Sequence, residues 1–109
     1  MLVYNVTVKV NTDIHEEWLE WMKKTHVPEV LATGFFSKSR ISKIDIQEDD
    51  GVTYAIQYDC FSIKSLNKYM SLYAPALQRK TLDRYTNQFV AFRTVLHVIE
   101  EIFPVHTKS

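Results

Sequence analysis

The order in which apolar periodicities follow one another constrains the fold of this chain most. Between Tyr4 and Val10 every second residue is apolar, which is typical of a strand with one buried face. The same pattern returns, less regularly in the second strand, at residues 35–46, 52–61 and 88–98. Two segments with helical spacing, beginning at Asp13 and Ser62, separate these strands. The sequence therefore predicts the order strand, helix, strand, strand, helix, strand.

Residues that start and stop helices and turns support this division. Asp13, with a glutamate three positions later, predicts a capped start of the first helix. Pro28 has no backbone donor, so we expect the first helix to break or kink near His26. The pair Asp50-Gly51 predicts a tight hairpin between the second and third strands.

The predicted order is that of the split βαβ unit, which folds as a ferredoxin-like α+β domain. Such a domain has a four-stranded antiparallel sheet with two helices on one face. The length of 109 residues suits a single domain. We expect the domain to span residues 1–100, with a C-terminal tail at residues 101–109.

The sheet face that the helices leave uncovered needs another partner. Strand parity assigns to this second face a mixed polar and apolar set: Asn5, Thr7, Ala55, Gln57, Ala91, Arg93 and Val95. The alternate residues of the last strand would then face the helices: Val90, Phe92, Leu96 and Val98. A two-fold contact is the commonest way to cover such a face, so we predict a homodimer whose sheets stack face to face.

Composition excludes several kinds of partner. Thirteen basic residues balance thirteen acidic ones, so we expect neither a nucleic-acid nor an anionic-membrane partner. The first strand follows Met1 directly, and no apolar run approaches the roughly 20 residues of a membrane span, so neither export nor membrane insertion is expected. Cys60 is the only cysteine, which favours a cytoplasmic location.

The sequence also argues against a metal or cofactor site. His15 and His26 are separated by eleven residues, about 16 Å along a helix, so they cannot bind one metal ion together. With only two glycines, a phosphate-binding loop or dinucleotide fingerprint is not possible. We therefore expect no metal and no cofactor.

Two groups of polar residues are candidates for function. His26 lies at the predicted break of the first helix, where it could cap the last turn or act as a pocket acid or base. Asn5, Gln57 and Arg93 are expected together on the second face. They would form either a network that sets the register of a dimer or a site in which Arg93 holds a small anion.

Aromatic residues between the predicted helices and sheet form a third candidate group. They are Trp18, Trp21, Tyr54, Tyr58 and Phe92. If they fill the space completely they form a core, and if not they line an aromatic pocket.

Four segments resemble a small bacterial family of unknown function: residues 4–7, 26–34, 53–58 and 92–94, where the second contains His26-Val27-Pro28. That family is similar in layout to the dimeric α+β barrel superfamily, in which two ferredoxin-like subunits join their sheets. The superfamily includes cofactor-independent monooxygenases, haem-degrading enzymes, stress-response barrels and ligand-sensing domains. The resemblance places Asn5 where oxygenase members have an asparagine. The tryptophan and histidine expected of a haem-degrading member are absent from the third strand and second helix.

Two functional hypotheses follow. The first is a homodimeric barrel that binds a small aromatic or carboxylate-bearing metabolite, or acts as a structural or regulatory module. The second is a cofactor-independent monooxygenase or isomerase, with His26 as base and Asn5 as an orienting amide. The distance between His26 and Asn5 discriminates between them.

Overall fold

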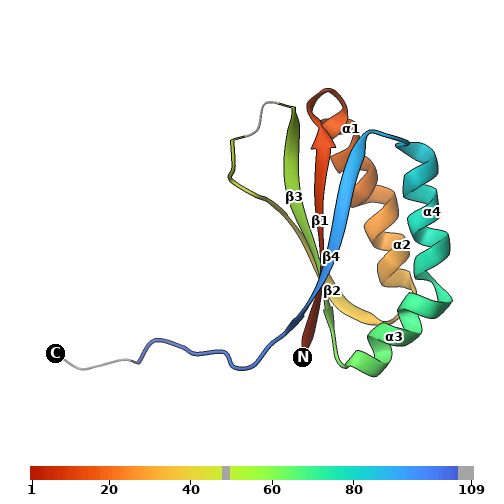
Figure 1. Ribbon diagram of the computed structural model, residues 1–109. Coiled ribbons are helices and arrows are strands. Elements are labelled where there is room, and N and C mark those ends of the chain that lie inside the picture. The colour runs from red at the N-terminus through yellow and green to blue at the C-terminus, as the bar shows by residue number, and fades with distance from the viewer. Residues whose placement is uncertain (48–49, 106–109) are drawn as a thin grey trace.

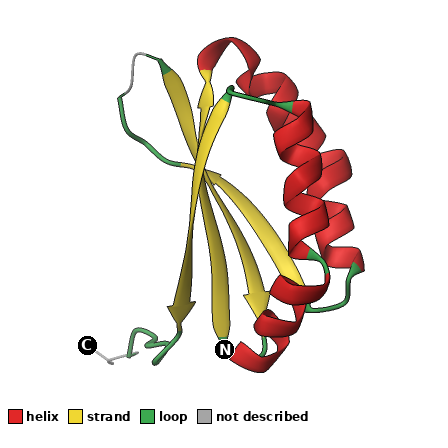
Figure 2. Ribbon diagram, turned by 45° about the vertical axis from the view of Figure 1, so that its right-hand side comes forward, coloured by secondary structure: helices red, strands yellow, loops and turns green. Residues whose placement is uncertain are grey.

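A computed structural model describes residues 1–47 and 50–105 and contains one four-stranded antiparallel sheet (Figure 1). The strands are β1 (Leu2–Asn11), β2 (Phe36–Lys43), β3 (Gly51–Cys60) and β4 (Phe89–His97), in the order β2-β3-β1-β4. The helices are α1 (His15–Trp21), α2 (Val27–Ala32), α3 (Ile63–Leu72) and α4 (Ala74–Arg84). All four lie on the same side of the sheet (Figure 2). The ferredoxin-like α+β fold is thus confirmed.

The core lies between this sheet and the helices. On β1 the residues of one parity face the helices, and their cross-strand partners on β3 do the same because the strands pair in register. Tyr4 pairs with Tyr58, and Val8 pairs with Tyr54, and all four side chains are buried. The period-two patterns of the first and third strands therefore predicted the buried face correctly.

The first helix starts differently from the prediction. Residues Thr12–Ile14 form a 3₁₀ turn that leads into α1, and no side chain caps either start. Asp13 lies inside that turn and is exposed, so the predicted capping role is wrong. In a 3₁₀ turn the backbone hydrogen bonds join residues three apart instead of four, and here this turn stands where a side-chain cap was expected.

Pro28 does not break the first helix. A π-helical turn, Met22–His26, joins α1 to α2, and the Val27 N–H donates to the Met22 carbonyl. In a regular α-helix the Pro28 ring would clash with the carbonyl four residues earlier, and the wider turn accommodates it. The helix is thus not interrupted, and its irregularity falls near His26, where Pro28 predicted a break or kink.

The orientation of β4 is opposite to the predicted one. Arg93 pairs with Val6 and Ala91 pairs with Val8, so both lie on the helix side of the sheet. Phe92, Val90 and Leu96 lie on the other face and are exposed. Both faces of β4 carry apolar residues, so its alternation could not show which face meets the helices.

The second face of the sheet is uncovered in this single chain (Figure 1). After β4 the chain extends away from the sheet, and residues 98–105 carry large exposed apolar side chains: Ile99, Ile102, Phe103 and Val105. Within the described part of the chain, no helix is long and apolar enough to span a membrane. The predicted hairpin falls partly on residues 48–49, which lie outside the described residues, and the end of the predicted tail at 106–109 does as well.

The start of α3 offers a test of these local assignments. The Ser62 hydroxyl accepts a hydrogen bond from the Ser65 N–H at 3.2 Å, as expected of an N-cap. We expect Ser62→Ala to lower the free energy of unfolding by about 1 kcal/mol, measured by urea denaturation. Ser71→Ala in the exposed last turn of the same helix is the control and should change stability by less than about 0.5 kcal/mol. Equal effects of the two substitutions would contradict the capping role.

Candidate functional site

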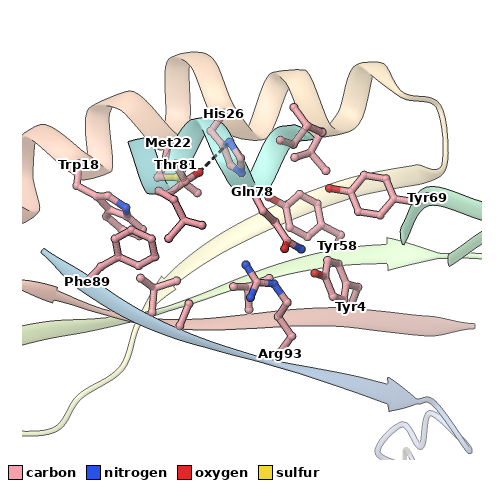
Figure 3. A pocket seen from close by; sticks show the side chains of 16 residues that line it. Tyr4, Trp18, Met22, His26, Tyr58, Tyr69, Gln78, Thr81, Phe89 and Arg93 are labelled. Carbon is pink, nitrogen blue, oxygen red and sulfur yellow. Dashed lines mark hydrogen bonds between the residues drawn. The ribbon is translucent and has the colours of Figure 1, made fainter. Parts of the chain in front are cut away.

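A cavity of about 240 Å³ lies between the helices and the sheet (Figure 3). We call it the helix–sheet cavity. Its sixteen lining residues come from β1, β3 and β4 on one side and from the helical layer on the other. Those labelled in Figure 3 are Tyr4, Trp18, Met22, His26, Tyr58, Tyr69, Gln78, Thr81, Phe89 and Arg93.

Tyrosines from three elements gather on one wall of the cavity. The rings of Tyr58 and Tyr69 lie 6.0 Å and 6.2 Å from the ring of Tyr4, and Phe36 packs against all three. Burial raises the pKa of each of these tyrosine hydroxyls. The hydroxyls therefore stay protonated at neutral pH and can donate hydrogen bonds.

Arg93 is the cation of the cavity. Its guanidinium points from the edge strand β4 toward Gln78 and Tyr4 (Figure 3). Arg93 and Gln78 each partly oppose the rise in the Tyr4 pKa that burial causes. The other three arginines each pair with a carboxylate: Arg40 with Asp59, Arg79 with Asp83 and Arg84 with Glu17. No carboxylate among the described residues forms such a pair with Arg93. Arg93 is exposed, so it brings a positive charge to the solvent-accessible side of the cavity, and no protein anion described here pairs with it.

His26 lies at the end of the π-helical turn and lines the cavity from the helical side. Its Nδ1 is 3.4 Å from the Thr81 hydroxyl, and its ring stacks on Trp21 at 5.2 Å. Burial lowers the pKa of His26 to about 4; Glu29 raises it in part, and Lys80 and Arg93 lower it further. The imidazole is therefore neutral at pH 7.

Trp18 is the third polar feature of the cavity wall. Its side chain is 1% exposed, and its ring packs against that of Tyr54 at 5.2 Å. The indole Nε1 is buried and has no hydrogen-bond partner among the described residues. The nearby Tyr54 hydroxyl is already hydrogen-bonded to His15 Nδ1 at 2.9 Å.

The predicted group of Asn5, Gln57 and Arg93 is not formed. Asn5 and Gln57 do pair across β1 and β3, on the uncovered face of the sheet. Arg93 lies on the helix side, because the register of β4 places it opposite Val6. Arg40 was not predicted to take part, but it donates to Gln57 Oε1 at 2.9 Å and to Asp59 at 2.8 Å.

Two of the five predicted pocket-lining residues, Trp18 and Tyr58, line the cavity. Trp21, Tyr54 and Phe92 do not line it. Trp21 stacks on His26 and meets Tyr85 edge to face, outside the lining, and the Tyr54 ring packs against Trp18. Phe92 is 65% exposed on the opposite face of the sheet. Phe92 was assigned to the wrong face of β4, whereas Tyr54 lies on the predicted face of β3 and is part of the core.

Several lining residues were not predicted. Gln78 and Thr81 are polar residues three apart on α4, next to the buried Leu77. Polar residues beside the apolar stripe of an amphipathic helix are the signal that could have found them. The alternative enzymatic hypothesis loses its pair of residues here, because His26 and Asn5 lie on opposite sides of the sheet.

The chemical capacity of the site follows from these groups. It offers one guanidinium, several hydroxyl donors, a neutral imidazole and a largely aromatic wall. Within residues 1–47 and 50–105 no group of three or more histidine, cysteine, aspartate or glutamate side chains could hold a metal ion. The arrangement suits a small organic anion better than a metal.

Comparison with solved structures supports the fold. HapK from Hahella chejuensis superposes with a TM-score of 0.70 at 5% identity, over 97% of this chain and 100% of that one. A dimeric ferredoxin-like protein from an uncultured marine organism gives 0.68 at 11% identity, over 95% and 100%. A Deinococcus radiodurans protein provisionally assigned as an antibiotic biosynthesis monooxygenase gives 0.67 at 13% identity, over 97% and 100%. At these identities the likeness concerns the fold alone.

A search of curated proteins finds no match to this chain. The sequence pattern of one family, a domain of unknown function (DUF4286), matches residues 1–99. The match covers all four strands and all four helices described above. The resemblance seen in the sequence is confirmed, and the chain belongs to the DUF4286 family.

Proposed function

We propose that this protein binds a small aromatic carboxylate-bearing metabolite in the helix–sheet cavity. The observation that carries the proposal is the guanidinium of Arg93, which points into an aromatic-lined cavity and has no carboxylate partner among the described residues. A charge beside a cavity of low polarity is stabilised when a ligand supplies the opposite charge.

The size and lining of the cavity support an aromatic ligand. An apolar cavity of about 150 Å³ is enough to bind benzene. At about 240 Å³ the helix–sheet cavity has room for one ring with substituents. Its aromatic and aliphatic walls, including Phe89, Val8 and Met22, favour a flat apolar body between polar ends.

The hydroxyl of Tyr4 and the amide of Gln78 support a carboxylate at the Arg93 end. Both lie beside the guanidinium, and the Tyr4 hydroxyl is protonated because burial raises its pKa. A carboxylate placed there could accept bonds from the guanidinium and from a neutral donor at once. A regulatory protein and an enzyme can both bind a ligand in this way, so the proposal does not require that the protein catalyses a reaction.

The first experiment measures binding of benzoate and ring-substituted benzoates by thermal shift and calorimetry. We expect Arg93→Ala to weaken binding about 10- to 100-fold, because a charge-assisted hydrogen bond is lost. Arg79→Ala is the matched control, since Arg79 is exposed on α4 and, among the described residues, pairs with Asp83. The proposal is contradicted if no benzoate binds, or if binding survives Arg93→Ala unchanged.

We also propose that two copies of the chain pair through their uncovered sheet faces. The exposed apolar side chains of β4, Phe92, Val90 and Leu96, lie on that face. The same face carries the hydrogen-bonded Arg40 and Gln57, on β2 and β3. The extended residues 98–105 would cover further apolar surface on a second copy. Two of the similar solved proteins are named dimeric ferredoxin-like proteins, which supports this assembly. Cys60, the single cysteine of the sequence, is buried, which agrees with a cytoplasmic setting.

Sedimentation velocity at micromolar concentration tests the dimer. We expect the parent chain to sediment at twice the chain mass and Phe92→Glu to sediment as a monomer, because a charge in the middle of an apolar interface is not compensated. Leu72→Glu is the control: Leu72 is 66% exposed, Phe92 is 65% exposed, and Leu72 lies on the helical layer. A monomeric parent chain would refute the assembly.

The second candidate function is a cofactor-independent monooxygenase or isomerase that uses His26 as a base. The neutral imidazole of His26 in the cavity wall favours it, and Asn5 has no part in it. Three of the similar solved structures are provisionally assigned as antibiotic biosynthesis monooxygenases, which is compatible with this alternative.

The protonation of His26 gives this alternative a physical test. Because the pKa of His26 is lowered to about 4 in the folded chain, the unfolded chain binds more protons between about pH 6.5 and pH 4. The folded state is therefore penalised as pH falls through this window, by up to about 3 kcal/mol at ~1.4 kcal/mol per pKa unit. We expect His26→Gln to remove most of that pH dependence in urea denaturation. His97→Gln is the control: His97 lies on the exposed end of β4, and its substitution should leave the pH dependence of stability unchanged. If NMR shows that His26 titrates near pH 6.5, a His26 that is neutral because of burial is contradicted.

A further inference from the structure

We propose that the ligand of the helix–sheet cavity has two polar ends: a carboxylate at Arg93 and a carbonyl oxygen that accepts a hydrogen bond from the indole N–H of Trp18. The ligand class is then an aromatic carboxylic acid with an acyl substituent on its ring. This inference rests on the proposed function and specifies the ligand of the same site.

The unpaired indole nitrogen is the starting observation. Trp18 is 1% exposed, and its Nε1 has no partner in the described part of the chain. The indole N–H is a donor only, so an acceptor must be brought to it. Buried donors are almost always paired, and a pair supplied by a ligand would explain this exception.

The surroundings of Trp18 leave the cavity as the place from which an acceptor could come. Trp18 lines the cavity, and in Figure 3 its nitrogen lies on the side of the ring toward the other lining residues. The Tyr54 ring packs against it, but the Tyr54 hydroxyl is engaged with His15 Nδ1. Met22 and Phe89, which line the cavity together with Trp18, are apolar and offer no strong acceptor.

Trp18 and Arg93 require two different oxygen groups. Trp18 packs on Tyr54, which pairs with Val8, whereas Arg93 pairs with Val6 two residues away on β1. Val6 and Val8 lie about 7 Å apart along the strand, so we expect the indole of Trp18 and the guanidinium of Arg93 to meet different parts of a ligand. The two oxygens of a single carboxylate share one carbon atom and cannot serve both sites. A ligand that satisfies both ends needs a second oxygen across the ring.

The acceptor at the Trp18 end is best a neutral one. The nearest charged group of the cavity is Arg93, at the other end, and no cation is placed beside Trp18 to offset a second anion. An ionised group without a counter-charge is costly to bury, whereas a carbonyl needs only one donor. A carbonyl oxygen is therefore favoured over a second carboxylate.

A matched pair of ligands tests the inference. Para-acetylbenzoate and para-isopropylbenzoate have nearly the same shape, but only the first has the carbonyl oxygen. We expect the parent chain to prefer the acetyl compound about tenfold by calorimetry, as one buried hydrogen bond allows. Trp18→Phe keeps an aromatic ring and removes the N–H, and it should abolish the preference while changing isopropyl binding little. Trp21→Phe, outside the cavity lining, should keep the preference.

The outcomes separate this inference from the proposed function. If both acids bind, Arg93→Ala weakens both, and the parent chain shows no preference, the carbonyl contact is wrong while the carboxylate site stands. If neither acid binds, both proposals are wrong. Should Trp18→Phe fail to fold, the indole N–H resonance of Trp18 in the parent chain replaces it, with Trp21→Phe used to assign the two signals. That resonance should shift with the acetyl compound and not with the isopropyl compound, and equal shifts would overturn the contact.

Discussion

The pairing of β1 with both of its neighbours is the constraint on which the rest of this structure depends. As the strand between β3 and β4, it fixes the register of each, and register decides which side chains face the helices. A shift of one residue in β4 would replace Arg93 by a neighbour and remove the only arginine from the cavity wall. The backbone hydrogen bonds between β1 and β4 thus determine whether the cavity wall contains the positive charge of Arg93.

The helical layer covers one face of the sheet and separates two chemical environments. The covered face contains the aromatic cavity, where burial keeps tyrosine hydroxyls protonated and the His26 imidazole neutral. The uncovered face carries the Arg40, Gln57 and Asp59 contacts together with the exposed Phe92. Because the sheet is a single layer, each strand contributes alternate residues to both environments.

Much of the fold could be predicted from the sequence, because β1 and β3 have one clearly apolar face. The candidate site could be predicted only in part. Trp18 and Tyr58 line the helix–sheet cavity, but Arg93 was assigned to the wrong face because β4 is apolar on both. The orientation of an edge strand of this kind depends on its pairing with β1, which local periodicity does not contain. His26 was identified as a candidate, whereas its neutral state depends on burial by side chains distant in sequence.

The π-helical turn Met22–His26 has a consequence for related chains that differ in length. Relative to a regular α-helix it accommodates one additional residue between α1 and α2. Deleting that residue would restore ordinary helical phase and rotate α2 by about 100° relative to α1. Trp18 and Val30, both now buried against the sheet, could then no longer face it together. A relative with a shorter first helical segment must therefore pack that segment, and shape its cavity, in another way.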